Sequence, residues 1–222
     1  MAAGRGERMR PLSDKTPKPL LPSADRCLLG QQIDFIRPFV KNLHVTVGHL
    51  ANQVATYAKG HDVDNIVDIQ QGGNASWIKF AEFNQIETST LVITSDNLMQ
   101  LDLNVLFTES QVDINRSLIV PVIAENNEPG DRILLEGKQV AIITPRKVSN
   151  LLASGLQVIN PSIAFLSSID GDDFSQIWNG LISNQQLLIS ELRPSSWFAI
   201  DTPEDLEIWS LASKNTFLNG PR

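Results

Sequence analysis

The chain has 222 residues, 42% of them hydrophobic, and a formal net charge of −7 at pH 7. That length and apolar content suit one globular domain, so we expect residues 1–222 to form a single domain. The acidic balance excludes the broad basic surface that is typical of proteins that bind DNA or RNA. The single cysteine, Cys27, excludes a disulfide framework and predicts a reducing compartment.

No apolar run approaches the ~18 residues of a membrane-spanning helix. The N-terminal residues also lack the apolar segment of a signal peptide. We therefore expect a cytoplasmic protein that has neither a membrane nor a nucleic acid as a partner. Its expected oligomeric state is a monomer or a homodimer.

Helical and β-rich segments alternate along most of the chain. Helical spacing is found over 28–36, 49–58, 174–182 and 203–212, and β-rich runs over 43–47, 65–69, 90–94, 117–124, 155–159 and 197–200. Residues 132–143 predict a hairpin with its turn at Glu136-Gly137, and Pro121 predicts an edge position or a bulge for its strand. The alternation from 43 to 113 predicts a three-layer, Rossmann-like α/β fold with a mixed, mostly parallel central sheet.

The first residues, Ala3-Gly4-Arg5-Gly6-Glu7-Arg8, precede every predicted element. Glycine permits close backbone approach, so successive N–H groups of this segment can form an anion-binding nest. Arg8 can bind a phosphate through two N–H groups, and Lys18 can add a point charge. A short Gly-x-Gly-x-Arg pattern is by itself more typical of a plain turn than of an anion site. The longer run in which it stands favours the anion site.

Two aspartates directly follow apolar strands, Asp96 after 90–94 and Asp201 after 197–200. Ligands of α/β sheets bind beyond the carboxyl ends of the strands. The two carboxylates can therefore share one Mg²⁺, which prefers oxygen ligands. The alternative is that each caps a turn or a helix, as Asp201 can do just before Thr202-Pro203. A phosphate-binding loop together with an acidic pair indicates phosphoryl or nucleotidyl transfer.

The run GRGERMRPLSDKTPKPLLP, over residues 4–22, resembles the signature of the sugar-phosphate nucleotidyltransferases. Four later stretches resemble further motifs of that family in the same order: VTVGHLANQVATYA, LVITSDNLMQLDL, ASGLQVINP and WFAIDTPEDL. Together they cover most of the chain. The length is similar to that of the small single-domain members, among them the N-acetylmuramate-1-phosphate uridylyltransferases of sugar nucleotide biosynthesis for the cell wall.

The resemblance implies an enzyme that transfers a nucleoside monophosphate from a nucleoside triphosphate to a sugar 1-phosphate, with Mg²⁺ as cofactor and release of pyrophosphate. It implies the following roles: catalytic, Arg8, Lys18 and Asp96; metal-binding, Asp96 and Asp201; nucleotide-binding, Ala3, Gly4, Gly6, Arg8, Gln70, Gly73 and Asn74; sugar-binding, Lys147, Ser154 and Gly155.

The sequence departs from the family pattern at three places. The family has an apolar strand ahead of its Ala-Ala-Gly, and this sequence begins at Met1. We expect either that the natural chain begins further upstream or that another element fills this position. The base-binding loop has Trp77 where the family has a small residue. Ser95 stands where the family often has glycine, and a positive φ at that turn would strain a serine.

These departures keep two alternatives open. Phosphocholine cytidylyltransferases resemble this chain in having Asn and Ser in the base-binding loop and Asp-Asn at the metal site, here Asp96-Asn97. A relative that binds nucleotide without turnover is the second alternative. A nicotinamide-dependent dehydrogenase fits less well, because the glycine-rich loop is not followed by the acidic residue of such a site.

Overall fold

The computed structural model describes residues 1–23, 26–69, 72–80, 83, 88–124, 129–146, 148–160 and 170–218. The chain divides into two compact units. The first comprises Met1–Gln71, Thr94–Met99 and Phe198–Arg222, and the second comprises Gly72–Ile93 and Gln100–Trp197. The expectation of a single domain stays a prediction, and each unit is described by itself.

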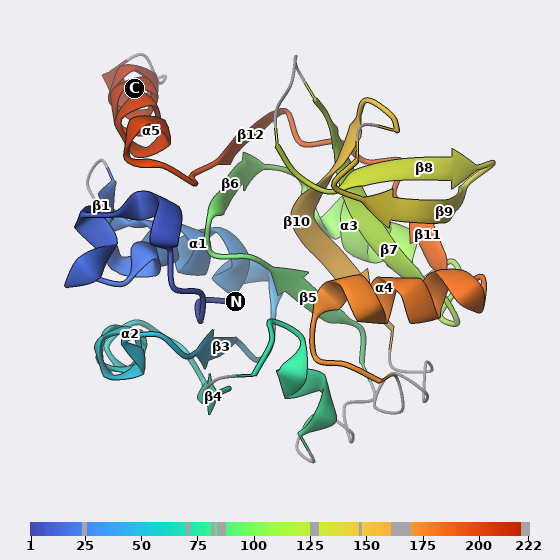
Figure 1. Ribbon diagram of the computed structural model, residues 1–222, viewed down its shortest axis with the longest axis horizontal. Helices are drawn as coiled ribbons and strands as arrows, with labels where there is room; N and C mark the ends of the chain where they lie inside the picture. Colours follow the sequence, from blue (N-terminus) through green and yellow to red (C-terminus); the bar gives the residue numbers. More distant parts are fainter. Residues whose placement is uncertain are drawn as a thin grey trace. The chain divides into compact units, whose positions relative to one another are not determined.

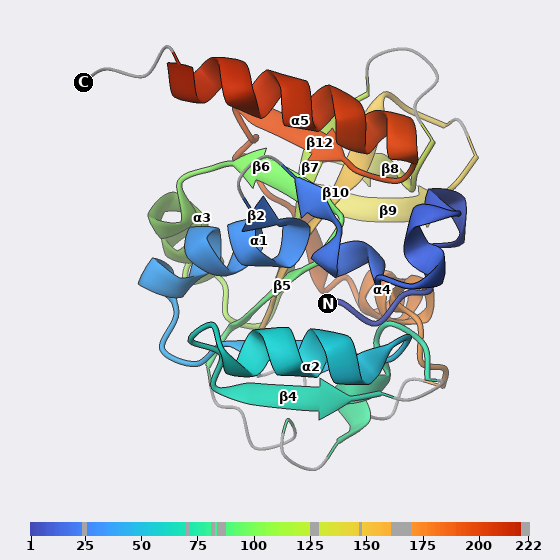
Figure 2. The same cartoon turned by 90° about the vertical axis from the view of Figure 1, so that its left-hand side faces the viewer.

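The first unit combines three helices with short strands. These are α1 (Leu28–Ile36), α2 (Ala51–Lys59), α5 (Pro203–Leu218), β1 (Pro22–Ser23), β2 (Arg26–Cys27), β3 (His44–Val47) and β4 (Asn65–Asp68). Strands β3 and β4 are parallel, with His44 opposite Asn65, and α2 packs along this pair (Figure 2). The helices at 28–36 and 203–212 are confirmed, the latter extending further than its pattern predicts.

The first three residues of the chain lie along β3. The Ala2 N–H donates to the Thr46 carbonyl at 3.0 Å, and the His49 N–H donates to the Ala3 carbonyl at 3.0 Å. The Met1 carbonyl accepts from the Ser95 N–H at 2.9 Å. Hydrogen bonds on both sides thus fix the chain that leads into the glycine-rich loop, as buried backbone groups require.

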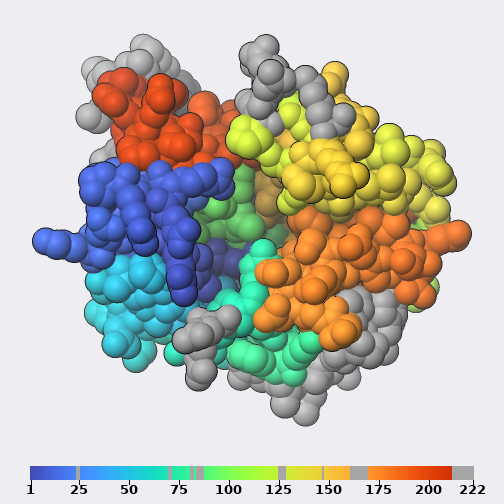
Figure 3. Space-filling view, viewed as in Figure 1, coloured from blue at the N-terminus to red at the C-terminus, as the bar shows by residue number. Residues whose placement is uncertain are grey.

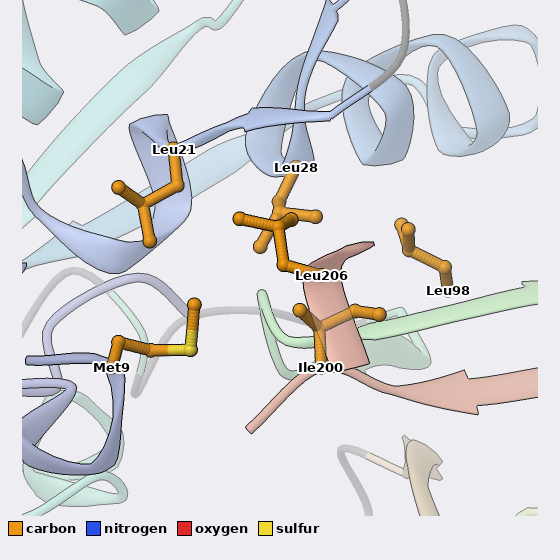
Figure 4. Close-up of a cluster of buried hydrophobic side chains, with 6 residues drawn as sticks. All are labelled: Met9, Leu21, Leu28, Leu98, Ile200 and Leu206. Carbon is orange, nitrogen blue, oxygen red and sulfur yellow. The ribbon is translucent and has the colours of Figure 1, made fainter. Parts of the chain in front are cut away.

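A hydrophobic cluster holds the first unit together (Figure 4). Its buried members are Met9, Leu21, Leu28, Leu98, Ile200 and Leu206, with Phe198 and Trp209 packed against them. They come from the N-terminal run, α1, α5 and the paired strands β6 (Asn97–Gln100) and β12 (Ser196–Ala199). Because these segments are far apart in the sequence, burial of their side chains is what brings the N-terminal loop next to residues 96 and 201.

The second unit contains a six-stranded sheet (Figure 1). Its strand order is β5-β10-β7-β11-β9-β8. The bounds are β5 (Thr90–Ile93), β7 (Ser117–Ile123), β8 (Arg132–Glu136), β9 (Gln139–Thr144), β10 (Leu151–Ile159) and β11 (Leu187–Ile189), with helices α3 (Leu103–Ser110) and α4 (Phe174–Ser183).

The expected mixed α/β sheet is confirmed, but most of its described strand pairs are antiparallel. In the six-stranded sheet only β7 and β11 are parallel among the described pairs, while β10 runs antiparallel to β5, β7 and β8. The hairpin β8–β9 adds another antiparallel pair. The alternation of strands and helices identified the fold class, but it did not show that the single long strand β10 pairs with three others.

Pro121 lies in an interior strand beside a bulge, which is one of its two expected positions. Strand β10 advances four residues, from Ala153 to Gln157, while β7 advances two, from Pro121 to Ile119. Gly155 lies inside this bulge with φ of +81°, a conformation that favours glycine. The bulge therefore accommodates the proline in an interior strand and requires a glycine in the partner strand.

The hydrophobic pattern missed four short strands, β1, β2, β6 and β11, which have between two and four residues each. Such lengths are too short for a reliable alternation signal. No helix in the described part of the chain is long and apolar enough to cross a membrane.

Asp131 is a partly buried carboxylate at the start of β8. Its backbone carbonyl accepts from the Ala153 N–H at 2.9 Å, and burial raises the pKa of its carboxyl group above the ordinary value of 3.8. The native state therefore binds a proton more tightly than the unfolded chain does. The contribution of this carboxyl group to the free energy of unfolding therefore falls as the pH rises through the interval above 3.8.

We predict that Asp131→Asn stabilises the protein at pH 7, by less than about 1 kcal/mol because the group is partly hydrated. The gain should vanish below the ordinary pKa, where the wild-type carboxyl is neutral in both states. Urea unfolding of both proteins at pH 7 and pH 3.5 measures this difference. An equal difference at the two pH values would contradict the prediction.

Candidate active site

The glycine-rich loop ends at Gly6, which has a left-handed conformation with φ of 60° and ψ of 40°. Gly6 precedes a 3-10 helix over Glu7–Met9, and its carbonyl accepts from the Met9 N–H at 2.9 Å and from the Ser13 hydroxyl at 2.7 Å. Gly4 has open space around the position of a Cβ. Of the two glycines, Gly6 is therefore the one that the backbone itself requires.

Gly6 also packs directly against the side chain of Lys18. A Cβ at residue 6 would lie 2.9 Å from the Lys18 Cβ, which is closer than two carbon atoms can approach without displacement. The glycine thus lets the loop lie on the aliphatic part of the lysine, whose side chain is buried. This contact joins the predicted phosphate-binding loop to the predicted catalytic lysine.

The Lys18 ammonium group lies between the two predicted metal ligands. Its Nζ donates to Asp96 Oδ2 at 3.0 Å and to Asp201 Oδ1 at 2.9 Å. Arg8 also forms an ion pair with Asp201 Oδ1, at 3.0 Å from its terminal nitrogen. The structure therefore brings together all four charged residues that the sequence analysis selected in the first unit.

The turn that carries Asp96 is held by amide side chains. Gln32 of α1, which is buried, donates from Nε2 to the Thr94 carbonyl at 2.6 Å and to the Asn97 carbonyl at 2.8 Å. Asn97 donates to Asp96 Oδ1 at 2.9 Å. Sequence reasoning missed the role of Gln32, because a polar residue on a buried helix face gives no indication of its partner.

Asp201 does not cap α5, so that alternative is wrong. Thr202 caps the helix, since its hydroxyl accepts from the Asp205 N–H at 3.2 Å. Asp205 Oδ2 in turn accepts from the backbone N–H groups of Asp201 and Thr202, at 3.0 and 2.8 Å. This reciprocal arrangement fixes the backbone at residue 201 and leaves its carboxylate for Lys18 and Arg8.

Asp96 has a lowered pKa despite its burial. Burial alone would raise the pKa of this carboxyl group, but the charge and the hydrogen bond of Lys18, together with the hydrogen bond to Thr94, outweigh it. Asp96 is therefore ionised at neutral pH. An ionised carboxylate is what a metal ligand has to be.

The residues around Lys18 fit one hard divalent cation. Two carboxylates converge on the single Nζ position, so their oxygens already surround a place where positive charge is favoured. Mg²⁺ is usually bound by one or two carboxylates, with water and substrate phosphates completing its shell. No group of three or more His, Cys, Asp or Glu side chains that could hold a metal occurs among the described residues, so the protein side of this site would consist of the two aspartates.

The predicted base-binding residues belong to the second unit. Gly73 and Asn74 lie in a loop before the 3-10 helix over Ser76–Lys79, and Gln70 lies outside the described residues. Trp77, which replaces a small residue of the family pattern, is buried against Phe83 and Phe174. The tryptophan therefore belongs to the core of this unit and anchors the C-terminal end of the loop by packing against Phe83 and Phe174.

The predicted sugar-binding residues Ser154 and Gly155 lie at the bulge of β10. Ser154 is fully buried and its hydroxyl accepts from the Leu156 N–H at 3.3 Å, so its side chain does not reach solvent. The Ser154 carbonyl accepts from Trp197 Nε1 at 3.0 Å. Lys147 lies outside the described residues, and a role of this strand in sugar binding stays a prediction.

The concern about Ser95 is removed by the structure. The described non-glycine residues with positive φ are Leu50, Asp62 and Gln185, so Ser95 needs no strained conformation. It is buried, and its N–H is bonded to the Met1 carbonyl. Serine is compatible with the turn before Asp96.

Comparison with known proteins supports the sequence resemblance. Residues 1–97 match the model of the MobA-like NTP transferase domain. The CTP:phosphocholine cytidylyltransferase of Streptococcus pneumoniae superposes with a TM-score of 0.74 at 20% identity, over 96% of each chain. The fold is that of the nucleotidyltransferases. The resemblance to the sugar-phosphate nucleotidyltransferases is thereby confirmed.

Two curated relatives show how far the similarity in sequence extends. The bifunctional protein GlmU of Methanococcus maripaludis is 26% identical over 99% of this chain and 54% of its own length. The N-acetylmuramate alpha-1-phosphate uridylyltransferase of Neisseria meningitidis is 70% identical over 30 residues, which are 14% of this chain and 13% of that protein. The chain thus spans about half the length of the archaeal relative.

We predict that Gly6→Ala destabilises the protein by about 1–2 kcal/mol, because it combines a left-handed backbone with a clash against Lys18. Gly4→Ala is the matched control, since a Cβ there meets nothing within 4 Å. We expect its effect on the free energy of unfolding to stay within about 0.5 kcal/mol. Urea unfolding of both variants decides, and equal losses would show that the loop does not depend on the conformation of Gly6.

Proposed function

We propose that this protein is a Mg²⁺-dependent nucleotidyltransferase that acts on a sugar 1-phosphate in the cytoplasm. An oxygen of the sugar phosphate forms a bond to the α-phosphorus of a nucleoside triphosphate. The bond from that phosphorus to the bridging oxygen of the β-phosphate breaks, and pyrophosphate leaves. The contact of Lys18 with both Asp96 and Asp201 is the observation that carries this proposal.

The charges of the site explain why a metal ion belongs in it. Arg8 and Lys18 contribute two positive charges, and Asp96 and Asp201 contribute two negative ones, so the four side chains cancel. A nucleoside triphosphate brings several more negative charges. When bound by the two aspartates, Mg²⁺ supplies the positive charge that the reacting phosphates require.

The protein's own residues position the triphosphate and stabilise the negative charge that develops on it. The loop that ends at Gly6 presents backbone N–H groups to the triphosphate. Lys18, held by the two aspartates and by its contact with Gly6, keeps its ammonium group fixed where negative charge develops. Arg8, whose side chain is largely exposed, contributes further hydrogen bonds to phosphate. Catalysis of this kind needs orientation and charge and no covalent intermediate.

The acceptor is inferred from the names of similar proteins and from the residues at the predicted metal site. The relative from Neisseria meningitidis carries the name of an enzyme that acts on a phosphorylated sugar, N-acetylmuramate alpha-1-phosphate, which favours a sugar 1-phosphate. The structural similarity to a phosphocholine cytidylyltransferase, together with the Asp96-Asn97 sequence at the predicted metal site, favours phosphocholine as the second candidate.

The test is release of pyrophosphate from a panel that pairs ATP, CTP, GTP, UTP and dTTP with sugar 1-phosphates and with phosphocholine, each with Mg²⁺. We expect turnover with at least one sugar 1-phosphate. Turnover with phosphocholine alone would replace the acceptor by the second candidate. Nucleotide binding by calorimetry without pyrophosphate release from any pair would identify a binding protein and overturn the enzymatic proposal.

We predict that Lys18→Met lowers kcat/KM on the order of 10²–10⁴-fold, because it removes a fixed positive charge from the reacting phosphates. It also leaves two carboxylates facing one another. Lys15→Met, which changes an exposed lysine three residues away, is the control and should stay within twofold of wild type. A loss of less than threefold in Lys18→Met, with the fold intact by circular dichroism, would show that this lysine is not catalytic.

A further inference from the structure

The loop with Gly73 and Asn74 is hydrogen-bonded to the turn that precedes α4. The Gly73 N–H donates to Asp172 Oδ2 at 2.7 Å, and the Ala75 N–H donates to the Asp172 carbonyl at 2.7 Å. The Asn74 N–H donates to Asp173 Oδ1 at 3.3 Å. Both segments belong to the second unit, and the stretch at 72–80 lies against α4 in the space-filling view (Figure 3). Three consecutive amides of the loop are thus satisfied from one turn, about 100 positions later in the sequence.

The approach of the two segments leaves no room at Gly73. A Cβ there would lie 2.5 Å from the Asp172 carbonyl oxygen, which is a backbone atom that cannot turn away. Beneath the loop, the rings of Trp77 and Phe174 are 6.5 Å apart. The hydrogen bonds to Asp172 and Asp173 and the packing of Trp77 against Phe174 therefore hold the loop in one position.

A further hydrogen bond to this segment fixes the orientation of the Asn74 side chain. Asn74 Oδ1 accepts from the Phe174 N–H at 2.8 Å, in the first turn of α4. A backbone N–H can only donate, so the oxygen of the amide must be the atom that faces it. Among the residues that the structure describes, none accepts from the Nδ2 amino group, and Asn74 is exposed, so these N–H donors are available to a ligand.

We infer that the turn at Asp172–Phe174 makes Asn74 a fixed hydrogen-bond donor that selects nucleobases with a carbonyl oxygen. This inference rests on the proposed function and on the base-binding role that the sequence resemblance implies for this loop. A carbonyl oxygen on the edge of a base accepts a hydrogen bond from Asn74 Nδ2. An exocyclic amino group of a base is itself a donor, so it cannot accept from Nδ2. Adenine carries no carbonyl oxygen, so ATP should be the poorest substrate. Asp172 acts as a positioning residue.

The direct test is Asn74→Asp, which keeps an oxygen for the Phe174 N–H and replaces the free donor with an acceptor. We expect the ratio of kcat/KM for the preferred nucleotide to that for ATP to fall at least tenfold, with kcat for ATP not reduced. An unchanged ratio would overturn the inference, because the side chain would then not read the base.

Asp172→Ala tests the positioning role. We expect the Gly73 amide, which loses its acceptor, to exchange with deuterium at least tenfold faster and the KM for the preferred nucleotide to rise about tenfold, with kcat within threefold. Asp172→Asn retains an acceptor for the Gly73 N–H and should restore most of both values. Asp170→Asn, at an exposed neighbour in the same turn, is the matched control. Faster exchange in Asp172→Ala with an unchanged KM would show a merely structural bond.

The outcomes separate this inference from the proposed function. If the wild-type protein releases no pyrophosphate with any substrate pair, the enzymatic proposal fails, and calorimetry with the same nucleoside triphosphates reads the preference instead. Tighter binding of a carbonyl-bearing base than of ATP, abolished in Asn74→Asp, would support the inference without catalysis. Equal affinities for all nucleotides would overturn it.

Discussion

One buried lysine organises the candidate site. Lys18 draws the carboxylates of Asp96 and Asp201 to a single atom, although the three residues are distributed over almost the whole sequence. Taking such charges out of water is costly, and the cost is recovered only when geometry and additional hydrogen bonds are good. The rest of the first unit supplies that geometry: Gly6 packs on the lysine, Gln32 holds one acidic turn, and Asp205 holds the other.

In both units, hydrogen bonds from neighbouring residues hold the predicted ligand-binding residues in place. In the first, a charged centre is built by residues whose own backbones are held by side-chain hydrogen bonds. In the second, the loop at Gly73 is held by Asp172 and by the start of α4. In both cases the residues expected to touch a ligand are fixed by neighbours that carry no such expectation, and this is how a site acquires a single geometry before the substrate arrives.

The sequence predicted the parts of the structure that depend on local pattern. Helices α1 and α4 follow from apolar spacing, and the convergence of Arg8, Lys18, Asp96 and Asp201 follows from a motif whose spacing reflects a shared fold. The pairing of β10 with three other strands could not be read from the sequence, because registers between distant strands leave no local signal. The roles of Gln32 and Asp172 were hidden for the same reason, since a hydrogen bond to a distant backbone atom imposes no spacing.

The double hydrogen bond of Gln32 has a consequence for how far this chain can diverge. Its side chain spans two carbonyls, at residues 94 and 97, on either side of the acidic residue between them. An apolar replacement would leave both carbonyls without these hydrogen bonds inside the core, and a shorter amide would not reach them. The buried face of α1 therefore tolerates less evolutionary substitution than its hydrophobic pattern suggests, and its one amide position should drift more slowly than the leucines and isoleucines beside it.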